Sequence, residues 1–140
     1  MELNPYRRQV YYYETDQMAI VHHSNYIRWF EEARLDFMDQ AGVSYRALEQ
    51  SGIIIPVVDV QCSYLSSARF DDRLEIRPIL TKYTGVRMVF RYEVRFQKDG
   101  SLSATGTSSH CFLDENHRPV SLKRRDPELH VLLSGLVEPE

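Results

Sequence analysis

Residues 11–34, YYYETDQMAIVHHSNYIRWFEEAR, decide how the rest of the chain is expected to fold. The stretch begins with tyrosines, which favour a strand, and then passes the carboxylates of Glu14 and Asp16. Asp16 stands a few residues before a predicted helix, whose first turn carries free backbone N–H groups and a positive dipole end. Donors of this kind stabilise the oxyanion that develops in acyl transfer. A carboxylate facing them is therefore a candidate for that chemistry.

The segment after the two histidines has the periodicity of an amphipathic helix. Ser24 is a candidate N-cap, the helix should run to about residue 41, and Gly42 is its expected stop. The apolar stripe, which Trp29 and Met38 widen, consists of Tyr26, Phe30, Ala33, Phe37 and Ala41. A single long helix with one apolar face needs a surface on which to lie.

The remaining sequence predicts that this surface is a sheet. Strands are expected at about residues 6–13, 58–64, 74–83, 86–96 and 102–113, with a short helical turn at 45–50. Apolar and polar residues alternate in 86–96, and Asp99-Gly100 is a hairpin signal, so the sheet should be antiparallel. The predicted fold class is α+β, with one long central helix wrapped by a five-stranded antiparallel sheet. We expect one domain over residues 1–140, with a core at about 6–122 and a tail, 123–140, that is a short helix or partly disordered.

Composition narrows the class of protein. Among 140 residues, 17 are basic and 20 acidic, so no polybasic footprint points to nucleic acid. The longest apolar run, 53–58, is interrupted by Pro56, and no membrane span is expected. The N-terminus lacks the apolar core of a signal peptide, and two cysteines are too few for a disulfide framework. The expected location is the cytoplasm.

Three motifs carry a resemblance to a known family. The first is Y-x-T-D-x-x-x-I-V-H-H-x-N-Y-x-x-W-F-E-x-A-R, and the others are CSYLSSARFDDRLEI at 62–76 and FLDENHRPVSL at 112–122. Together they resemble hotdog-fold acyl-CoA thioesterases of the 4-hydroxybenzoyl-CoA thioesterase family, and most closely the YbgC-like branch. The resemblance covers roughly residues 6–122. It implies hydrolysis of an acyl-CoA thioester without a further cofactor, coenzyme A being part of the substrate.

The resemblance also implies site residues. Asp16 matches the family's catalytic aspartate, either a nucleophile or a general base, and the oxyanion donor matches the backbone N–H of His23 or its neighbour. The His23 ring is a candidate for orienting water or substrate. The residues expected along the substrate site are His22, Ser24, Asn25 and Tyr26. Many relatives have glycine where this chain has Ala19, and an aromatic residue where it has His22, which leaves the acyl preference open.

Other interpretations of these residues remain open. Glu14 is a second carboxylate close to Asp16, and Glu31 is the second candidate for the acid, although a salt bridge with a nearby arginine is its plainer role. Asn25 can serve the helix cap or the loop. No metal is expected, because the adjacent His22 and His23 cannot readily share one ion in regular geometry.

Basic residues on the predicted strand at 86–96 have two interpretations as well. Arg87, Arg91 and Arg95 share one face and are candidates for the phosphates of coenzyme A. Glu93 is interleaved with them, which instead favours a solvated face.

These observations predict a cytoplasmic acyl-CoA thioester hydrolase. Because a single sheet has exposed edges, we expect a homo-oligomer, either a dimer or a tetramer of two dimers, with active sites at subunit boundaries. The alternatives are a hotdog dehydratase or hydratase acting on acyl thioesters, and a non-catalytic acyl-CoA-binding module. Acyl-chain preference, and the choice between nucleophile and general base for Asp16, stay open.

Overall fold

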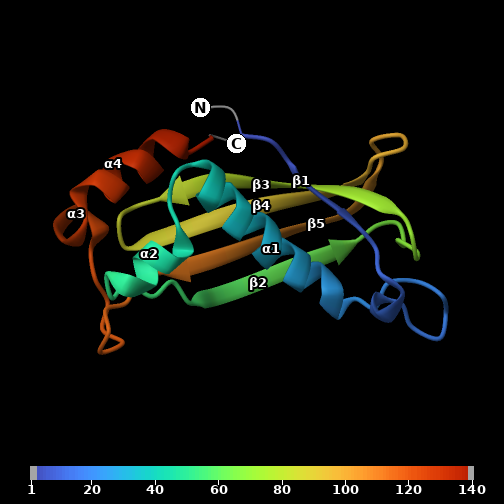
Figure 1. The fold of residues 1–140 in the computed structure, drawn as a ribbon, viewed down its shortest axis with the longest axis horizontal. Helices are drawn as coiled ribbons and strands as arrows, with labels where there is room; N and C mark the ends of the chain where they lie inside the picture. Colours follow the sequence, from blue (N-terminus) through green and yellow to red (C-terminus); the bar gives the residue numbers. More distant parts are fainter. Residues whose placement is uncertain (1–2, 139–140) are drawn as a thin grey trace.

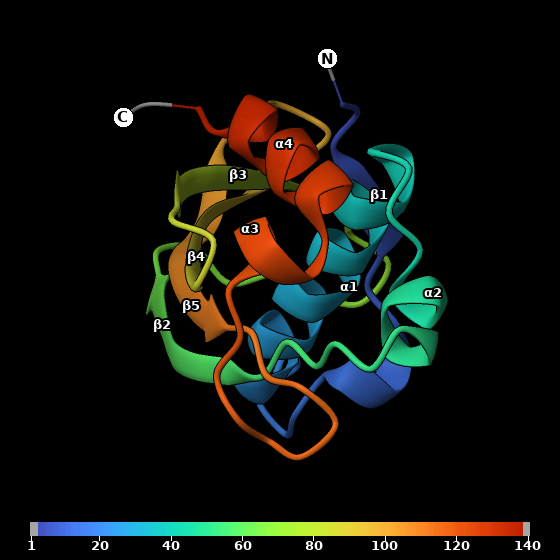
Figure 2. The ribbon, with the colours of Figure 1, turned by 90° about the vertical axis from the view of Figure 1, so that its left-hand side faces the viewer.

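The computed structural model describes residues 3–138. In chain order its elements are β1 (Tyr6–Gln9), the 3-10 turn η1 (Tyr12–Glu14), α1 (Ser24–Gln40), α2 (Tyr45–Gln50), β2 (Val57–Tyr64), β3 (Arg73–Tyr83), β4 (Arg87–Phe96), β5 (Leu102–Cys111), α3 (Leu122–Arg125) and α4 (Pro127–Leu136). The strands form one antiparallel sheet in the order β1-β3-β4-β5-β2. Helix α1 crosses one face of this sheet (Figure 1), and the sheet curves around it (Figure 2). The predicted α+β class is confirmed. Within residues 3–138, none of the helices has the length and apolar character that a membrane-spanning helix requires.

The apolar stripe of α1 forms the centre of the core. The Phe30 ring stacks on Tyr92 of β4 with centroids 4.4 Å apart, and Phe37 meets Phe90 edge-on at 5.3 Å. Beneath Phe30 lies Gly106 of β5, where an added Cβ would overlap the Phe30 ring. Glycine at this position therefore lets the helix approach the sheet closely.

The ends of α1 lie close to their predicted positions. Gly42 has φ +88°, and the next N–H, that of Val43, bonds to Met38 O at 2.8 Å, which confirms the predicted stop. The predicted N-cap is wrong by one residue, since Ser24 is the first helical residue and His23 occupies the cap without a side-chain bond. The Ser24 hydroxyl instead bonds to the His22 ring nitrogen Nδ1 at 2.8 Å.

The first strand is shorter than predicted. It ends at Gln9, and residues 12–14 form η1 instead of continuing the strand. The cause is the buried Glu14 side chain, which accepts hydrogen bonds from Tyr11 N at 2.8 Å and from Trp29 Nε1 at 2.9 Å. These bonds turn the chain toward α1 and leave the rings of the tyrosines at 11–13 at the surface.

The tail forms two helices, α3 and α4. Asp126 caps α4 by accepting a bond from Leu129 N at 3.2 Å. Leu129, Leu133 and Leu136 are buried against the core. Of the two interpretations offered for the tail, the helical one is correct for residues 123–136, whereas residues 139–140 lie outside the described part of the chain.

Candidate active site

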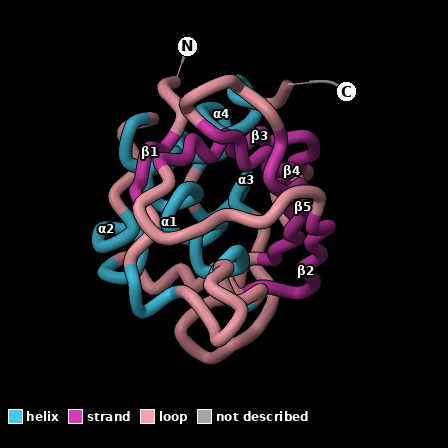
Figure 3. Tube along the Cα trace, turned by 90° about the vertical axis from the view of Figure 1, so that its right-hand side faces the viewer, coloured by secondary structure: helices cyan, strands magenta, loops and turns pink. Residues whose placement is uncertain are grey.

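A cleft lies at the end of the sheet where α1 begins. The loop before α1 and the last residues of β2 meet there (Figure 1), and Figure 3 looks onto this end of the molecule, where loops predominate. Its volume is about 250 Å³. The lining residues are Asp16, Met18, Ile20, Val21, His23, Tyr26, Tyr64, Leu65, Ser66 and Ser67. The cleft therefore combines apolar and aromatic side chains with one carboxylate.

A tight loop holds Asp16 at the mouth of this cleft. Thr15 and Val21 form an isolated antiparallel bridge, and the Asp16 N–H donates to Ile20 O at 2.9 Å. Between them Ala19 has φ +64°, a conformation that costs a residue with a Cβ about 1 kcal/mol. The loop therefore adopts a backbone conformation suited to glycine.

The Asp16 side chain is oriented by one hydrogen bond. Its Oδ1 accepts from the Met18 N–H at 2.8 Å, and Oδ2 has no partner within residues 3–138. The side chain is neither fully buried nor fully exposed. An oriented carboxylate with one oxygen available can accept a proton from water or attack a carbonyl.

One backbone N–H at the start of α1 has no acceptor in the described part of the chain, and it belongs to a residue that lines the cleft. The His22 N–H donates to Glu14 O at 2.8 Å, and the Ser24 N–H donates to the His22 ring nitrogen Nδ1 at 3.2 Å. The next two N–H groups, those of Asn25 and Tyr26, donate to His22 O at 3.0 Å and to His23 O at 3.3 Å. The N–H of His23, by contrast, has no acceptor in the described part of the chain. Of these five consecutive N–H groups, that of His23 alone is available to a ligand.

Asn25 lies behind this donor. Its side chain is buried, and its Nδ2 donates to Glu14 O at 3.0 Å and to His22 O at 3.2 Å. Both acceptors are backbone carbonyls, so the amide hydrogens bind the loop. This geometry matches the alternative in which Asn25 holds the loop.

Tyr64 of β2 forms the opposite wall and was not anticipated from the sequence. Its hydroxyl donates to His23 O at 3.1 Å, and its ring meets Tyr26 edge-on at 5.2 Å. Desolvation, with the Cys62 thiol beside it, raises the pKa of Tyr64 to about 12, so the hydroxyl stays protonated at neutral pH. Tyr64 lies within one of the motifs that carried the resemblance, but no role was assigned to it.

The six predicted site residues fall into two groups. Asp16, His23 and Tyr26 line the cleft. His22, Ser24 and Asn25 lie beside it; the His22 ring stacks on that of His23 with centroids 4.2 Å apart. Leu65, Ser66 and Ser67 line the cleft and were missed, because nothing local in a strand end signals a binding wall.

The other carboxylates considered have different surroundings. Glu14 is buried and paired with Arg8, whose Nη1 lies 2.8 Å from Oε2. Glu31 is exposed on α1, and within residues 3–138 it forms no ion pair, so the bridge considered with a nearby arginine is not seen. Neither residue lines the cleft that contains Asp16.

The arginines of β4 lie on the outer face of the sheet. Arg91 Nη1 is 3.0 Å from Glu93 Oε2, and Arg95 Nη2 is 3.7 Å from the same oxygen. Arg95 also donates to Gly100 O at 2.8 Å. This pairing favours the solvated face over a phosphate site for Arg91 and Arg95.

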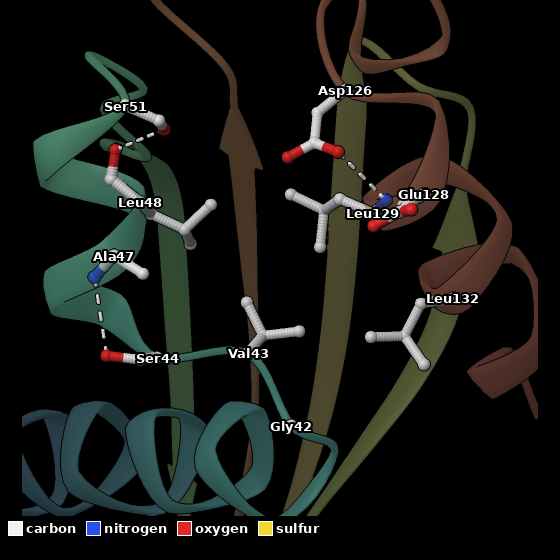
Figure 4. A pocket seen from close by; sticks show the side chains of 10 residues that line it. All are labelled: Gly42, Val43, Ser44, Ala47, Leu48, Ser51, Asp126, Glu128, Leu129 and Leu132. Carbon is white, nitrogen blue, oxygen red and sulfur yellow. Dashed lines mark hydrogen bonds between the residues drawn. The ribbon is translucent and has the colours of Figure 1, made fainter.

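A second cavity of about 250 Å³ lies between α2 and α4 (Figure 4). Its apolar residues include Leu48, Leu129 and Leu132, and its polar groups serve helix ends. Ser44 Oγ accepts from Ala47 N at 3.3 Å, and Asp126 caps α4. The Asp126 carboxylate is thus engaged in a helix cap, and no residue of the motifs that resemble the thioesterases lines this cavity, so the Asp16 cleft is the better candidate for chemistry.

Comparisons with known proteins support the fold that the sequence predicts. Residues 10–130 match the family model described as the thioesterase-like superfamily. The chain is 33% identical over 123 residues to YneP of Bacillus subtilis, a proposed acyl-CoA thioesterase, covering 87% of this chain and 88% of that protein. It is 31% identical over 86 residues to the acyl-CoA thioester hydrolase YbgC of Escherichia coli, covering 61% and 64% of the two chains.

Solved structures give the same result. The DHNA-CoA thioesterase from Staphylococcus aureus superposes with a TM-score of 0.90 and 34% identity, over 94% of this chain and 89% of that one. A protein from Thermus thermophilus, TT1821, superposes with a TM-score of 0.88 and 34% identity, over 96% and 99% of the two chains. The predicted hotdog fold and the resemblance to thioesterases are thereby confirmed. The chain belongs to the thioesterase-like superfamily.

Proposed function

We propose that this protein hydrolyses acyl-CoA thioesters in the Asp16 cleft. One observation carries the proposal: the same cleft is lined by an oriented carboxylate and by the residue whose backbone N–H is available at the start of α1. In thioester hydrolysis a negative charge develops on the carbonyl oxygen, and a preorganised N–H donor stabilises it. The positive end of the 17-residue helix α1 adds to that stabilisation.

The proposed reaction consumes one water and releases a carboxylic acid and coenzyme A. In the general-base route Asp16 takes a proton from water, the hydroxide attacks the carbonyl carbon, and the oxyanion forms at the His23 N–H. Collapse of this intermediate breaks the carbon–sulfur bond, and the thiolate leaves with the proton that Asp16 held. In the nucleophilic route Asp16 Oδ2 attacks the carbonyl carbon, and the carbon–sulfur bond breaks to release the coenzyme A thiolate and leave a mixed anhydride. Water then hydrolyses the anhydride to the free acid and the Asp16 carboxyl, whose proton neutralises the thiolate.

The substrate class is proposed from the lining of the cleft and from the relatives. Tyr26, Tyr64, Met18, Ile20 and Leu65 present an apolar and aromatic surface suited to an acyl group. The Staphylococcus aureus relative is named for an aromatic acyl-CoA, whereas YbgC is named for acyl-CoA in general. Both aromatic and aliphatic acyl-CoAs therefore belong in the first panel of substrates.

We further propose that the protein works as a homodimer joined through β2. This strand pairs only with β5 and ends the sheet, so its other edge is unpaired within residues 3–138. Val57 and Val58 on it are about half exposed. An unpaired apolar edge favours pairing with a second copy, and Tyr64 would bring the cleft close to that boundary.

The test is release of free thiol from a panel of acyl-CoAs by the wild type and by two variants. Asp16→Asn keeps the shape of the side chain and removes its charge and basicity. We expect kcat to fall by a factor of about 100 or more with KM and melting temperature little changed. Glu31→Gln is the matched control on α1, and it should leave kcat within about twofold.

Each other outcome has a distinct meaning. Loss of activity in Glu31→Gln, with Asp16→Asn still active, would identify Glu31 of α1 as the catalytic carboxylate in place of Asp16. Conversion of an enoyl-CoA to its hydroxyacyl-CoA without thiol release would indicate a hydratase. Tight acyl-CoA binding with no product from any substrate would indicate a binding module.

A further inference from the structure

The peptide group between His22 and His23 is fixed on its carbonyl side by one residue, Asn25. Its carbonyl oxygen accepts two hydrogen bonds from Asn25, one from the backbone N at 3.0 Å and one from the side-chain Nδ2 at 3.2 Å. Its N–H is the available donor at the start of α1. We propose that Asn25 is a positioning residue that aims the His23 N–H at the reacting carbonyl, a role that rests on the proposed hydrolase function.

The geometry of the peptide bond links the two sides of this group. A trans peptide is planar, so its C=O and N–H point in opposite directions and rotate together. Holding His22 O therefore sets the direction of the His23 N–H. Any rotation of the peptide would break both bonds from Asn25.

The amide of Asn25 is itself anchored. Nδ2 also donates to Glu14 O at 3.0 Å, an oxygen that accepts from the His22 N–H at 2.8 Å. The Glu14 carboxylate is fixed by Arg8 at 2.8 Å and by Trp29 Nε1 at 2.9 Å. The side chain of Asn25 thus ties the segment at residue 14, the peptide at residue 22 and the first turn of α1 into one rigid unit.

Burial and polarisation make this arrangement effective. Asn25 is 7% exposed, so water does not readily replace its amide hydrogens if they are removed. Donors bound to a carbonyl also polarise the rest of the peptide, which strengthens its N–H as a donor. Asn25 therefore affects both the direction and the strength of the proposed oxyanion donor without touching substrate.

The test compares Asn25→Asp with the wild type. This variant keeps the size of the side chain but replaces the donating NH₂ with a carboxylate oxygen that faces two carbonyls. We expect kcat to fall by about 10- to 100-fold, less than the loss of an entire oxyanion donor, while KM changes less than about threefold. Relative to wild type, its activity should recover as pH falls, because the protonated carboxyl regains a donor.

A direct measurement of the donor complements the kinetics. In an Asp16→Asn background, which should not turn over, the carbonyl stretch of a bound acyl-CoA reports how strongly the thioester is polarised. We expect the shift to lower frequency on binding to diminish when Asn25→Asp is added. If Asn25→Asp does not fold, Asn25→Ser, whose hydroxyl supplies one donor, serves in both measurements with smaller effects.

Ser108→Ala is the matched control, because Ser108 is also buried and bonds to Tyr92 Oη at 2.6 Å and His110 Nε2 at 2.7 Å, away from the cleft. It should lower the melting temperature and leave kcat unchanged. The inference fails if Asn25→Asp behaves in the same way, with wild-type kcat and carbonyl frequency. Absence of hydrolysis by the wild type would instead overturn the proposed function, and the inference with it.

Discussion

His110 on β5 is a fully buried titratable side chain. Its Nε2 lies 2.7 Å from Ser108 Oγ, which in turn lies 2.6 Å from Tyr92 Oη, and Nδ1 has no hydrogen-bond partner within residues 3–138. Burial, and then the positive charge of Arg34, lower its pKa from 6.5 to about 4. The folded protein therefore keeps this imidazole neutral.

This predicts a loss of stability in mild acid. Between pH 6.5 and about 4 the unfolded chain binds a proton at His110 that the folded chain does not, so stability falls as pH falls through this window. At 1.36 kcal/mol per pKa unit the loss approaches about 3 kcal/mol. Urea unfolding at pH 7.5 and 4.5 measures it, with His110→Gln as the comparison. Equal losses in the two proteins would contradict the prediction.

For the site, the resemblance implies Asp16 as the catalytic carboxylate and the N–H of either His23 or its neighbour as the oxyanion donor. That choice depends on which N–H groups find acceptors, and the acceptors include Glu14 O and the His22 ring. Neither contact follows a local rule of sequence. The same is true of Asn25, whose partner at residue 14 lies eleven positions earlier.

At the scale of elements, α1 and β5 meet where Gly106 lies under the Phe30 ring. An added methyl group at Gly106 would overlap the ring and lie 2.7 Å from Gln61 O on β2. We predict that Gly106→Ala lowers the free energy of unfolding by about 2–3 kcal/mol, because neither the stacked ring nor the strand can move freely.

Gly135→Ala is the control for that prediction. Gly135 lies in α4, and an added Cβ there meets nothing within 4 Å. Alanine favours helix, so this variant should gain up to about 1 kcal/mol. Denaturant unfolding of both variants gives the comparison, and a neutral Gly106→Ala would show that α1 can shift away from β5.

Periodicity predicted the elements that obey it. The apolar stripe from Tyr26 to Ala41 predicted the bounds of the long helix, and the alternation of apolar and polar residues predicted those of the central strands. Both sets of bounds agree with the structure within one or two residues. The prediction of a strand at residues 11–13 was wrong. The strand propensity of the tyrosines is outweighed by the hydrogen bonds of the buried Glu14 carboxylate, which impose a turn. The tail was ambiguous, because the helix α4 depends on packing of its leucines against the core.

At the scale of the whole molecule, the proposed dimer gives a further prediction. Wild-type protein should have twice the chain mass in solution, and Val58→Lys should shift it toward the monomer with reduced activity, because a charge on the shared edge opposes pairing. Val131, which is 71% exposed on α4, provides the control Val131→Lys. Light scattering checks both variants. A monomeric wild type, or a Val58→Lys dimer, would count against an interface at β2.

The position of β2 in the sheet affects how the molecule is made. β2 is synthesised before β5, its partner in the sheet, and both β3 and β4 lie between them in the chain. Asp16 and α1 emerge earlier still, and they acquire their opposite wall, Tyr64, only when β2 is in place. Long-range pairing of this kind is slow and comes late in folding. Catalytic activity should therefore be one of the last properties that a newly synthesised chain acquires, appearing after its helices have formed.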